Sequence, residues 1–105
     1  MKLPKTINMS GIEWEVRRSE RGGGGFDSGE HWVDIGTYGD DKRQWEVFIH
    51  EITEGIMADN LMRYQKPFTR PTNGDYLFVF NHNDFEVMFA KPLAAMLWDL
   101  LPYWE

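Results

Sequence analysis

The sequence predicts one α+β domain over residues 1–105, and three observations lead to this fold class. A length of 105 residues suits one domain with one modest core. A hydrophobic fraction of 42% and an aromatic fraction of 15% supply enough apolar surface to bury. The hydrophobic period is two before Gly39 and close to 3.6 after it, so we expect the order β-β-β-α-β-α.

The first third of the chain predicts antiparallel strands. Ile12, Trp14 and Val16 alternate with charged residues, and Ser10-Gly11 is typical of the turn of a hairpin. The four glycines 22–25 predict a mobile loop, because glycine loses much backbone entropy when it is ordered. A phosphate-binding loop is the alternative, but the run lacks a Lys-Ser/Thr ending. Alternation through 32–36 predicts a further strand.

A long helix is predicted from about Lys42 to Tyr64. Asp41 and Gln44 have the spacing of a capping box at its start. One apolar stripe follows, made of Trp45, Phe48, Ile49, Ile52 and Ile56.

The remainder of the chain predicts a loop, a strand and a closing helix. Residues 65–75 contain two prolines and Asn-Gly, which is typical of a loop. Residues 75–80 (DYLFVF) predict a strand that is buried on both faces or covered by a helix. The closing helix should run from Phe85 to about Leu101, with Asn83 and Glu86 spaced as its cap. Pro92 should kink or restart this helix, because proline lacks an N–H.

Composition excludes several classes of function. With no cysteine, a disulfide framework and a thiolate zinc site are both excluded. A net charge of −6 argues against nucleic acid as a partner. No apolar run has the length of a signal peptide or a membrane span, so we expect a cytoplasmic protein without a membrane partner.

The stretch FIHEITEGIM (48–57) carries the chemistry that the sequence predicts. His50 and Glu54 are four residues apart and therefore lie on one face of a helix, while Glu51 lies about 100° around it. The familiar zinc-hydrolase motif is HExxH, and here its second histidine is replaced by Glu54. An ordinary polar pair on the edge of an amphipathic helix remains the alternative to a metal site.

A metal site at this position needs a further ligand, since catalytic zinc usually takes three protein groups and a water. His82 is the candidate, because it lies where the predicted strand 75–80 leads into the closing helix. His50, Glu54 and His82 would then form a His₂Glu set for one zinc ion. Asp84 and Glu86 are alternative ligands if the helix begins a residue or two away.

Three segments carry a resemblance to a known group of proteins: KLPKTINMSGIEWEV, FIHEITEGI and NHNDFEVMFAKPLAAML. They resemble small phage and prophage proteins that are similar to minimal zincin-like metallopeptidase domains. Many of those carry HExxE followed by a distal histidine. The resemblance implies a zincin-like fold, His50, Glu54 and His82 as metal ligands and Glu51 as general base. The loop 65–75, the tetraglycine and Pro92 depart from the pattern of that group.

Two hypotheses of function follow. The first is a metal-dependent hydrolase, with zinc as cofactor, that cleaves a peptide or another amide bond, and strand 75–80 could hold an extended substrate if it lies at a sheet edge. The second is a phage-encoded binding protein on a decayed zincin scaffold, in which Trp98 and Trp104 contact a partner.

Overall fold

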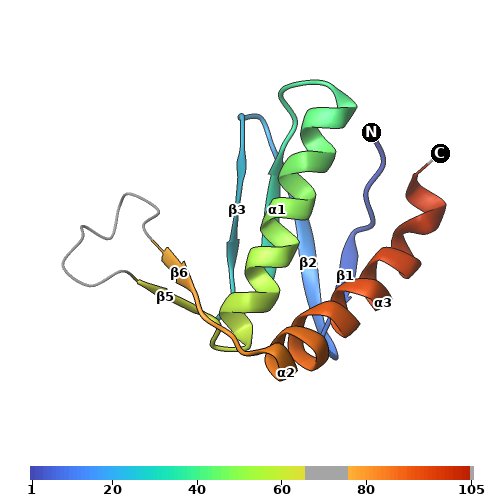
Figure 1. The fold of residues 1–105 in the computed structure, drawn as a ribbon. Helices are drawn as coiled ribbons and strands as arrows, with labels where there is room; N and C mark the ends of the chain where they lie inside the picture. Colours follow the sequence, from blue (N-terminus) through green and yellow to red (C-terminus); the bar gives the residue numbers. More distant parts are fainter. Residues whose placement is uncertain (66–75, 105) are drawn as a thin grey trace.

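A mixed four-stranded sheet lies beside two main helices in the computed structural model, which describes residues 1–65 and 76–104 (Figure 1). The strands are β1 (Thr6–Met9), β2 (Ile12–Ser19), β3 (Gly24–Asp27) and β4 (Trp32–Gly36). Their order in the sheet is β1-β2-β4-β3, so β3 forms an edge. β1 and β3 are antiparallel to their neighbours, but β2 and β4 are parallel, so the prediction of antiparallel N-terminal strands is wrong for this pair. The reason is β3, which the sequence did not predict and which reverses the chain between β2 and β4. The α+β class is confirmed.

The predicted hairpin is confirmed at β1 and β2. Its turn is Ser10-Gly11, where φ is 54° and 86°. Glycine adopts this left-handed region without the penalty that a Cβ brings. The Asn8 side chain accepts a hydrogen bond from the Gly11 N–H at 2.9 Å, which helps to close the turn.

The glycine run differs from the prediction, because its second half is a strand. Gly24 and Gly25 begin β3 and pair with Ile35 and Asp34 of β4. A Cβ at Gly24 would lie 2.5 Å from the Asp34 carbonyl oxygen and 2.7 Å from Cγ1 of Val47. β3 therefore approaches the neighbouring helix more closely than a strand with larger side chains could.

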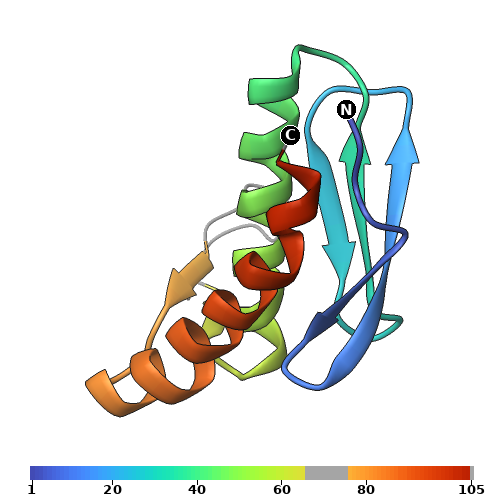
Figure 2. The same cartoon turned by 90° about the vertical axis from the view of Figure 1, so that its right-hand side faces the viewer.

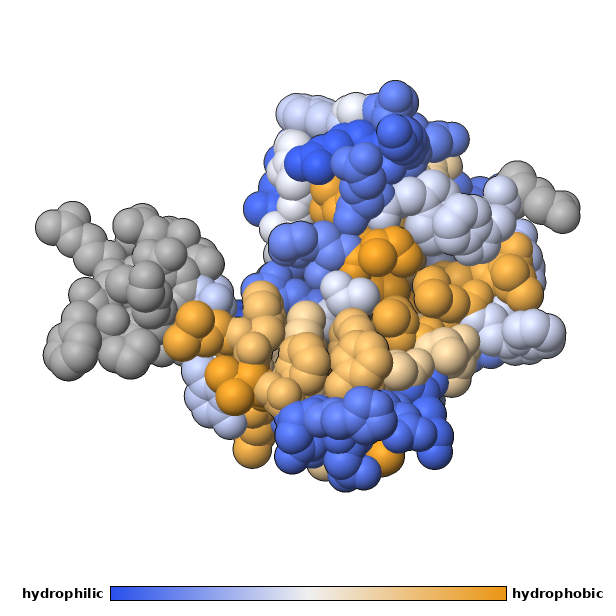
Figure 3. Space-filling model, viewed as in Figure 1, coloured by the Kyte–Doolittle hydropathy of each residue, from blue (hydrophilic) through white to orange (hydrophobic). Residues whose placement is uncertain are grey.

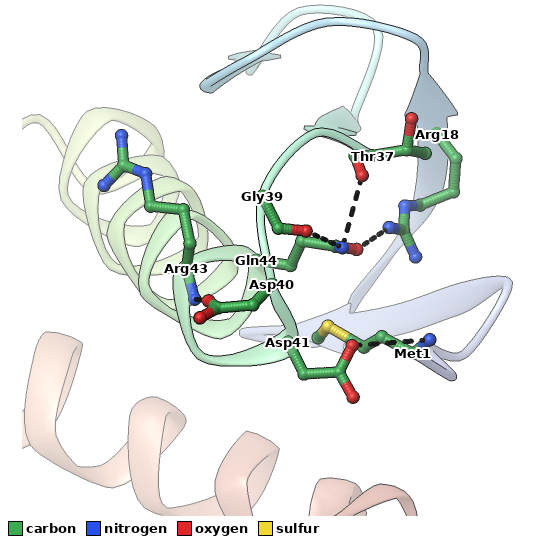
Figure 4. A network of polar contacts seen from close by, with 8 residues as sticks. All are labelled: Met1, Arg18, Thr37, Gly39, Asp40, Asp41, Arg43 and Gln44. Carbon is green, nitrogen blue, oxygen red and sulfur yellow. Dashed lines mark hydrogen bonds and ion pairs between the residues drawn. The ribbon is translucent and has the colours of Figure 1, made fainter.

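That helix, α1 (Asp41–Asp59), begins one residue before the predicted start, and its N-cap is Asp40. The Asp40 carboxylate accepts a hydrogen bond from the Arg43 N–H at 2.9 Å. Gln44 does not close a capping box, because its amide donates to the carbonyls of Thr37 and Gly39 and accepts from Arg18 (Figure 4).

The end of α1 falls five residues before the predicted end. Asn60 caps the helix, and its side-chain amide donates to the Ile56 carbonyl at 2.9 Å. Leu61 then has a φ of 58°, a left-handed conformation that stops the helix. The backbone consequently turns into β5 (Arg63–Gln65) instead of continuing as helix.

The core lies between the sheet and the helices. Figure 2 shows α1 and the C-terminal helix on the same side of the sheet. The predicted stripe of α1 faces this core: Phe48, Ile52 and Ile56 are fully buried. Trp14 of β2 lies on the face of the sheet that packs against α1, and it is also fully buried. The other buried apolar residues are Ile7, Met9, Val33, Ile35, Val47, Met62, Met96 and Leu100.

The strand that the sequence predicts at 75–80 is shorter in the structure, and its side chains are partly exposed. β6 (Tyr76–Phe78) pairs only with β5 in the part of the chain that the structure describes, as a separate two-stranded sheet. Leu77 and Phe78 are 44% and 43% exposed, so burial on both faces was a wrong prediction. The loop predicted at 65–75 lies outside the described residues, apart from Gln65, which ends β5.

Three helical segments form the closing helix: α2 (His82–Asp84), a π-helical segment (Phe85–Ala90) and α3 (Lys91–Leu100). Asn81, rather than Asn83, is the cap, and its side chain accepts from the Asp84 N–H at 2.9 Å. The Lys91 N–H reaches back five residues to the Glu86 carbonyl. Because Pro92 has no N–H to continue α-helical bonding, the register changes just before it. A 3₁₀ turn, Leu101–Tyr103, follows α3.

Apolar side chains also gather on the outside of the molecule. Figure 3 shows a band of hydrophobic surface running from the two-stranded sheet along the C-terminal helical segments. Large apolar side chains that are exposed between Tyr76 and Trp104 include Phe78, Val79, Phe80, Phe85, Val87, Met88, Trp98, Leu101 and Trp104. None of the helices over 1–65 and 76–104 has the length and hydropathy needed to cross a membrane.

Candidate metal centre

Three side chains of α1 bring metal-binding atoms together at one point. His50, Glu51 and Glu54 each offer a ligand atom, and these atoms all lie within 4.8 Å of one another. His50 Nε2 is 3.1 Å from Glu54 Oε2 and 3.9 Å from Glu51 Oε1. The predicted convergence of His50 and Glu54 is therefore present in the fold, and this cluster can hold a metal ion.

The spacing of these atoms suits a small divalent cation. Zinc binds imidazole nitrogen and carboxylate oxygen at about 2.0–2.2 Å, so neighbouring ligands of a tetrahedral site lie about 3.3–3.5 Å apart. The separation between His50 and Glu54 is close to this distance without any rearrangement. The same 3.1 Å separation also suits a hydrogen-bonded pair on a helix surface, so the distance alone does not distinguish a ligand pair from an i,i+4 pair.

The three side chains differ sharply in burial. The His50 side chain is 66% exposed, whereas those of Glu51 and Glu54 are 10% and 18% exposed. Glu51 lies under β3, where a Cβ at Gly24 would be 3.2 Å from its Cγ. An imidazole that solvent can reach thus stands beside two sheltered carboxylates.

Burial raises the pKa of Glu51, because desolvation disfavours the charged form. The neighbouring Glu54 also raises this pKa, while His50, Arg21 and Arg63 lower it. Carboxyl groups with raised pKa values in clefts are common among functional sites, although structural networks produce them as well.

The cluster forms one wall of a cleft of about 620 Å³. β3 contributes Gly24, Gly25 and Phe26 to the lining, and the two-stranded sheet contributes Arg63, Tyr76 and Phe78. Thr53 and Met57 of α1 complete it. The cleft therefore lies where α1, the edge of the main sheet and the small sheet meet.

The predicted third ligand is not part of this cluster. His82 begins α2 and is exposed, and within residues 1–65 and 76–104 the metal-capable group at α1 contains only His50, Glu51 and Glu54. The alternatives Asp84 and Glu86 are likewise outside the group. The fold thus brings together His50, Glu51 and Glu54, but not the His50, Glu54 and His82 set.

Sequence reasoning missed two cleft residues. Arg63 falls in the tail of the predicted helix, and Gly24 in the predicted mobile loop. Asn60, a residue favoured after helix ends, is the one local signal that α1 stops early enough for Arg63 to reach the cleft. The neighbouring sequence does not indicate that Gly24 lines the cleft. Glycine is required there because β3 approaches α1 closely, which only the tertiary structure shows.

No protein-family model, curated protein or solved structure matches this sequence. The zincin-like resemblance therefore depends on the three segments KLPKTINMSGIEWEV, FIHEITEGI and NHNDFEVMFAKPLAAML alone.

Proposed function

We propose that this protein is a zincin-like domain that binds one zinc ion and hydrolyses a peptide or another amide bond. His50 and Glu54 are two of its ligands, and the tests below decide whether Glu51 or His82 supplies a third. The observation that carries the proposal is the convergence of one imidazole and two carboxylates on the wall of an open cleft. Nitrogen and oxygen donors of this kind suit zinc among the common divalent metals.

Each side chain has a distinct role in this proposal. His50 and Glu54 hold the ion, which when bound polarises the scissile carbonyl and activates water. Glu51 takes a proton from the attacking water and returns it to the leaving amine. The shelter of Glu51 beneath β3 supports this role, because burial strengthens its hold on a proton.

Metal content after purification without added chelator tests the binding site. We expect about one zinc per wild-type molecule by elemental analysis, and none in a His50→Ala, Glu54→Ala double variant. His82→Ala is the matched control, since it removes another exposed histidine from the same protein. Zinc that persists in the double variant would rule out this site, and zinc lost from His82→Ala would make His82 a ligand.

Glu51→Gln separates the possible roles of Glu51 as general base and as metal ligand. Glutamine keeps the size of the side chain but cannot accept a proton at neutral pH. A general base predicts a variant that retains zinc and loses at least 100-fold in the rate of peptide cleavage. A variant that loses zinc instead would show that Glu51 is a ligand. Cleavage is followed by mass spectrometry on a mixed peptide library.

A second candidate function is that of a non-catalytic binding protein on the same scaffold. The exposed apolar band supports it, since monomeric proteins rarely expose large contiguous apolar patches. Trp98 is 73% exposed, and Trp104 is 57% exposed although it stacks on Trp45 at 4.7 Å. Glu51→Gln discriminates again, because partner capture through this band should not change in that variant.

A further inference from the structure

Arg63 occupies a distinctive position beside the metal-capable cluster. Its guanidinium carbon lies 3.7 Å from the centre of the Tyr76 ring and 5.0 Å from that of Phe26. Contacts of this kind hold the planar group by cation–π attraction and stacking. The side chain is 20% exposed and lines the same cleft as His50 and Glu51. The cleft therefore contains a positive charge whose position is set by two aromatic rings.

Within residues 1–65 and 76–104, the ion pair of the guanidinium is with Glu54, whose Oε1 lies 3.8 Å from Nη1. This distance is longer than a normal hydrogen bond, so the pair with Glu54 does not occupy the N–H donors of the group. Arginine binds carboxylates with two parallel hydrogen bonds, and such charge-assisted bonds are stronger in a partly sheltered cleft than in open water.

Strand β3 contacts both Glu51 and Arg63, so it relates the position of the Arg63 charge to that of the metal-capable cluster. Gly24 lies against Glu51, whereas Phe26, two residues further along the same edge strand, lies against Arg63. Two residues of a strand span about 6.6 Å. β3 is an edge of the main sheet, and edge strands present unpaired backbone groups to which an extended peptide can bond.

We propose that Arg63 selects substrates that carry a carboxylate one or two residues from the scissile bond, with the peptide extended along β3. This inference depends on the proposed function and adds the substrate class to it. The carboxylate is that of a peptide C-terminus or of an acidic side group, and both present the same two oxygens to the guanidinium.

A purely local role for Arg63 is the competing explanation. The guanidinium could serve only to orient Glu54, whose other oxygen contacts His50. In that case, replacing Arg63 would change zinc content and leave the preference among peptides unchanged. The two roles are therefore separable in one set of measurements.

The test uses zinc-loaded full-length protein and four acetylated five-residue peptides. Two are all-alanine and end in a free carboxylate or an amide, and two are amides with a central glutamate or glutamine. Binding is measured by NMR titration of the amide signals of Gly24, Gly25 and Phe26. Mass spectrometry of the same samples reports cleavage, and initial rates replace the titration for any peptide that is cleaved.

The variants are Arg63→Met, which keeps an unbranched side chain without charge, and Arg63→Lys, which keeps charge without the planar fork. Arg17→Met is the matched control. Arg17 also lies over an aromatic ring, 4.6 Å from the centre of Trp32, but on β2 and outside the lining of the cleft.

We expect wild type and Arg17→Met to prefer at least one carboxylate peptide over its neutral partner by about tenfold. Arg63→Met should lower this ratio to about one, and Arg63→Lys should retain part of it. Which pair shows the preference distinguishes a C-terminal carboxylate from an acidic side group.

Two results would overturn the inference. One is equal binding or cleavage of charged and neutral peptides by wild type, and the other is a preference for the charged peptide that persists in Arg63→Met. Failure of the proposed function has a different signature. If the preference depends on Arg63 but no peptide is cleaved, the result supports carboxylate recognition by Arg63 and contradicts the proposed hydrolysis. Zinc-dependent cleavage without preference would reject recognition alone.

Discussion

Replacing Gly24 with alanine should destabilise the fold, because β3 lies too close to its neighbours to accept a Cβ. The added carbon would lie 2.5 Å from the Asp34 carbonyl oxygen and 2.7 Å from Val47 Cγ1, against an ordinary contact distance of about 3.5–4.0 Å. The first of these atoms belongs to the backbone of β4 and cannot move without shifting the strand. Overpacking of this kind lowers the free energy of unfolding by about 1–3 kcal/mol.

The assay is thermal and urea unfolding followed by circular dichroism, with Gly55→Ala as the matched control. A domain of this size loses roughly 4–8 °C in Tm per kcal/mol. At Gly55 the nearest atom is the flexible end of Met9, 3.0 Å from the new Cβ, and alanine favours helix by about 1 kcal/mol. Gly55→Ala should therefore be neutral or stabilising. Equal Tm values for Gly24→Ala and wild type would refute the reasoning, as would an equal loss in both variants.

Three further predictions concern α1. Burial raises the pKa of Glu51, so the folded state of metal-free protein binds more protons than the unfolded state, and stability falls as pH rises above the ordinary carboxyl pKa of about 4.3. Glu51→Gln should therefore be more stable than wild type at pH 7.5 in urea unfolding with chelator, and should lose this advantage below about pH 4; a constant difference would contradict the assignment. Ile52→Ala should lower the free energy of unfolding by about 2–5 kcal/mol and the half-buried Ile49→Ala by less, and the reverse order would show that the stripe faces elsewhere. Asp40→Ala should lower it by about 0.5–2 kcal/mol, whereas Asp41→Ala, one residue inside the helix, should have a smaller effect; an equal loss would mean that the cap is not at Asp40.

The elements that could be predicted are those in which local pattern and tertiary environment agree. The hairpin of β1 and β2 and the apolar stripe of α1 follow from side-chain period, because each buries one face against the same core. β3 could not be predicted, since a four-residue strand that begins with two glycines has no period to detect. Its pairing with β4, the next strand along the chain, and its approach to α1 stabilise it, and the glycine run itself carries a signal for neither contact.

The candidate site divides in the same way. His50 and Glu54 were predictable because residues four apart on a helix are neighbours whatever the rest of the fold does. Placing a ligand from the C-terminal segment required the tertiary path of the backbone, and His82 lies outside the cluster that α1 forms. Placing Arg63 in the cleft required knowing where α1 ends, and that end depends on the left-handed conformation of Leu61. Neither position could be derived from spacing.

Under the proposed function, the distances in the cluster support Glu51 as the proton acceptor and not as a permanent metal ligand. Its oxygen lies 3.9 Å from His50 Nε2, longer than the 3.1 Å separation of the Glu54 pair and longer than the edge of a tetrahedral zinc site. Its side chain is the more deeply sheltered of the two carboxylates and is enclosed on one side by β3. Burial raises the pKa of Glu51 above that of an ordinary surface carboxylate, and a raised pKa suits the role of general base that we propose for it. The close approach of Gly24 thus connects the stability of β3 to the chemistry of Glu51, since the contact that a Cβ would disrupt is also the one that shelters this carboxyl group.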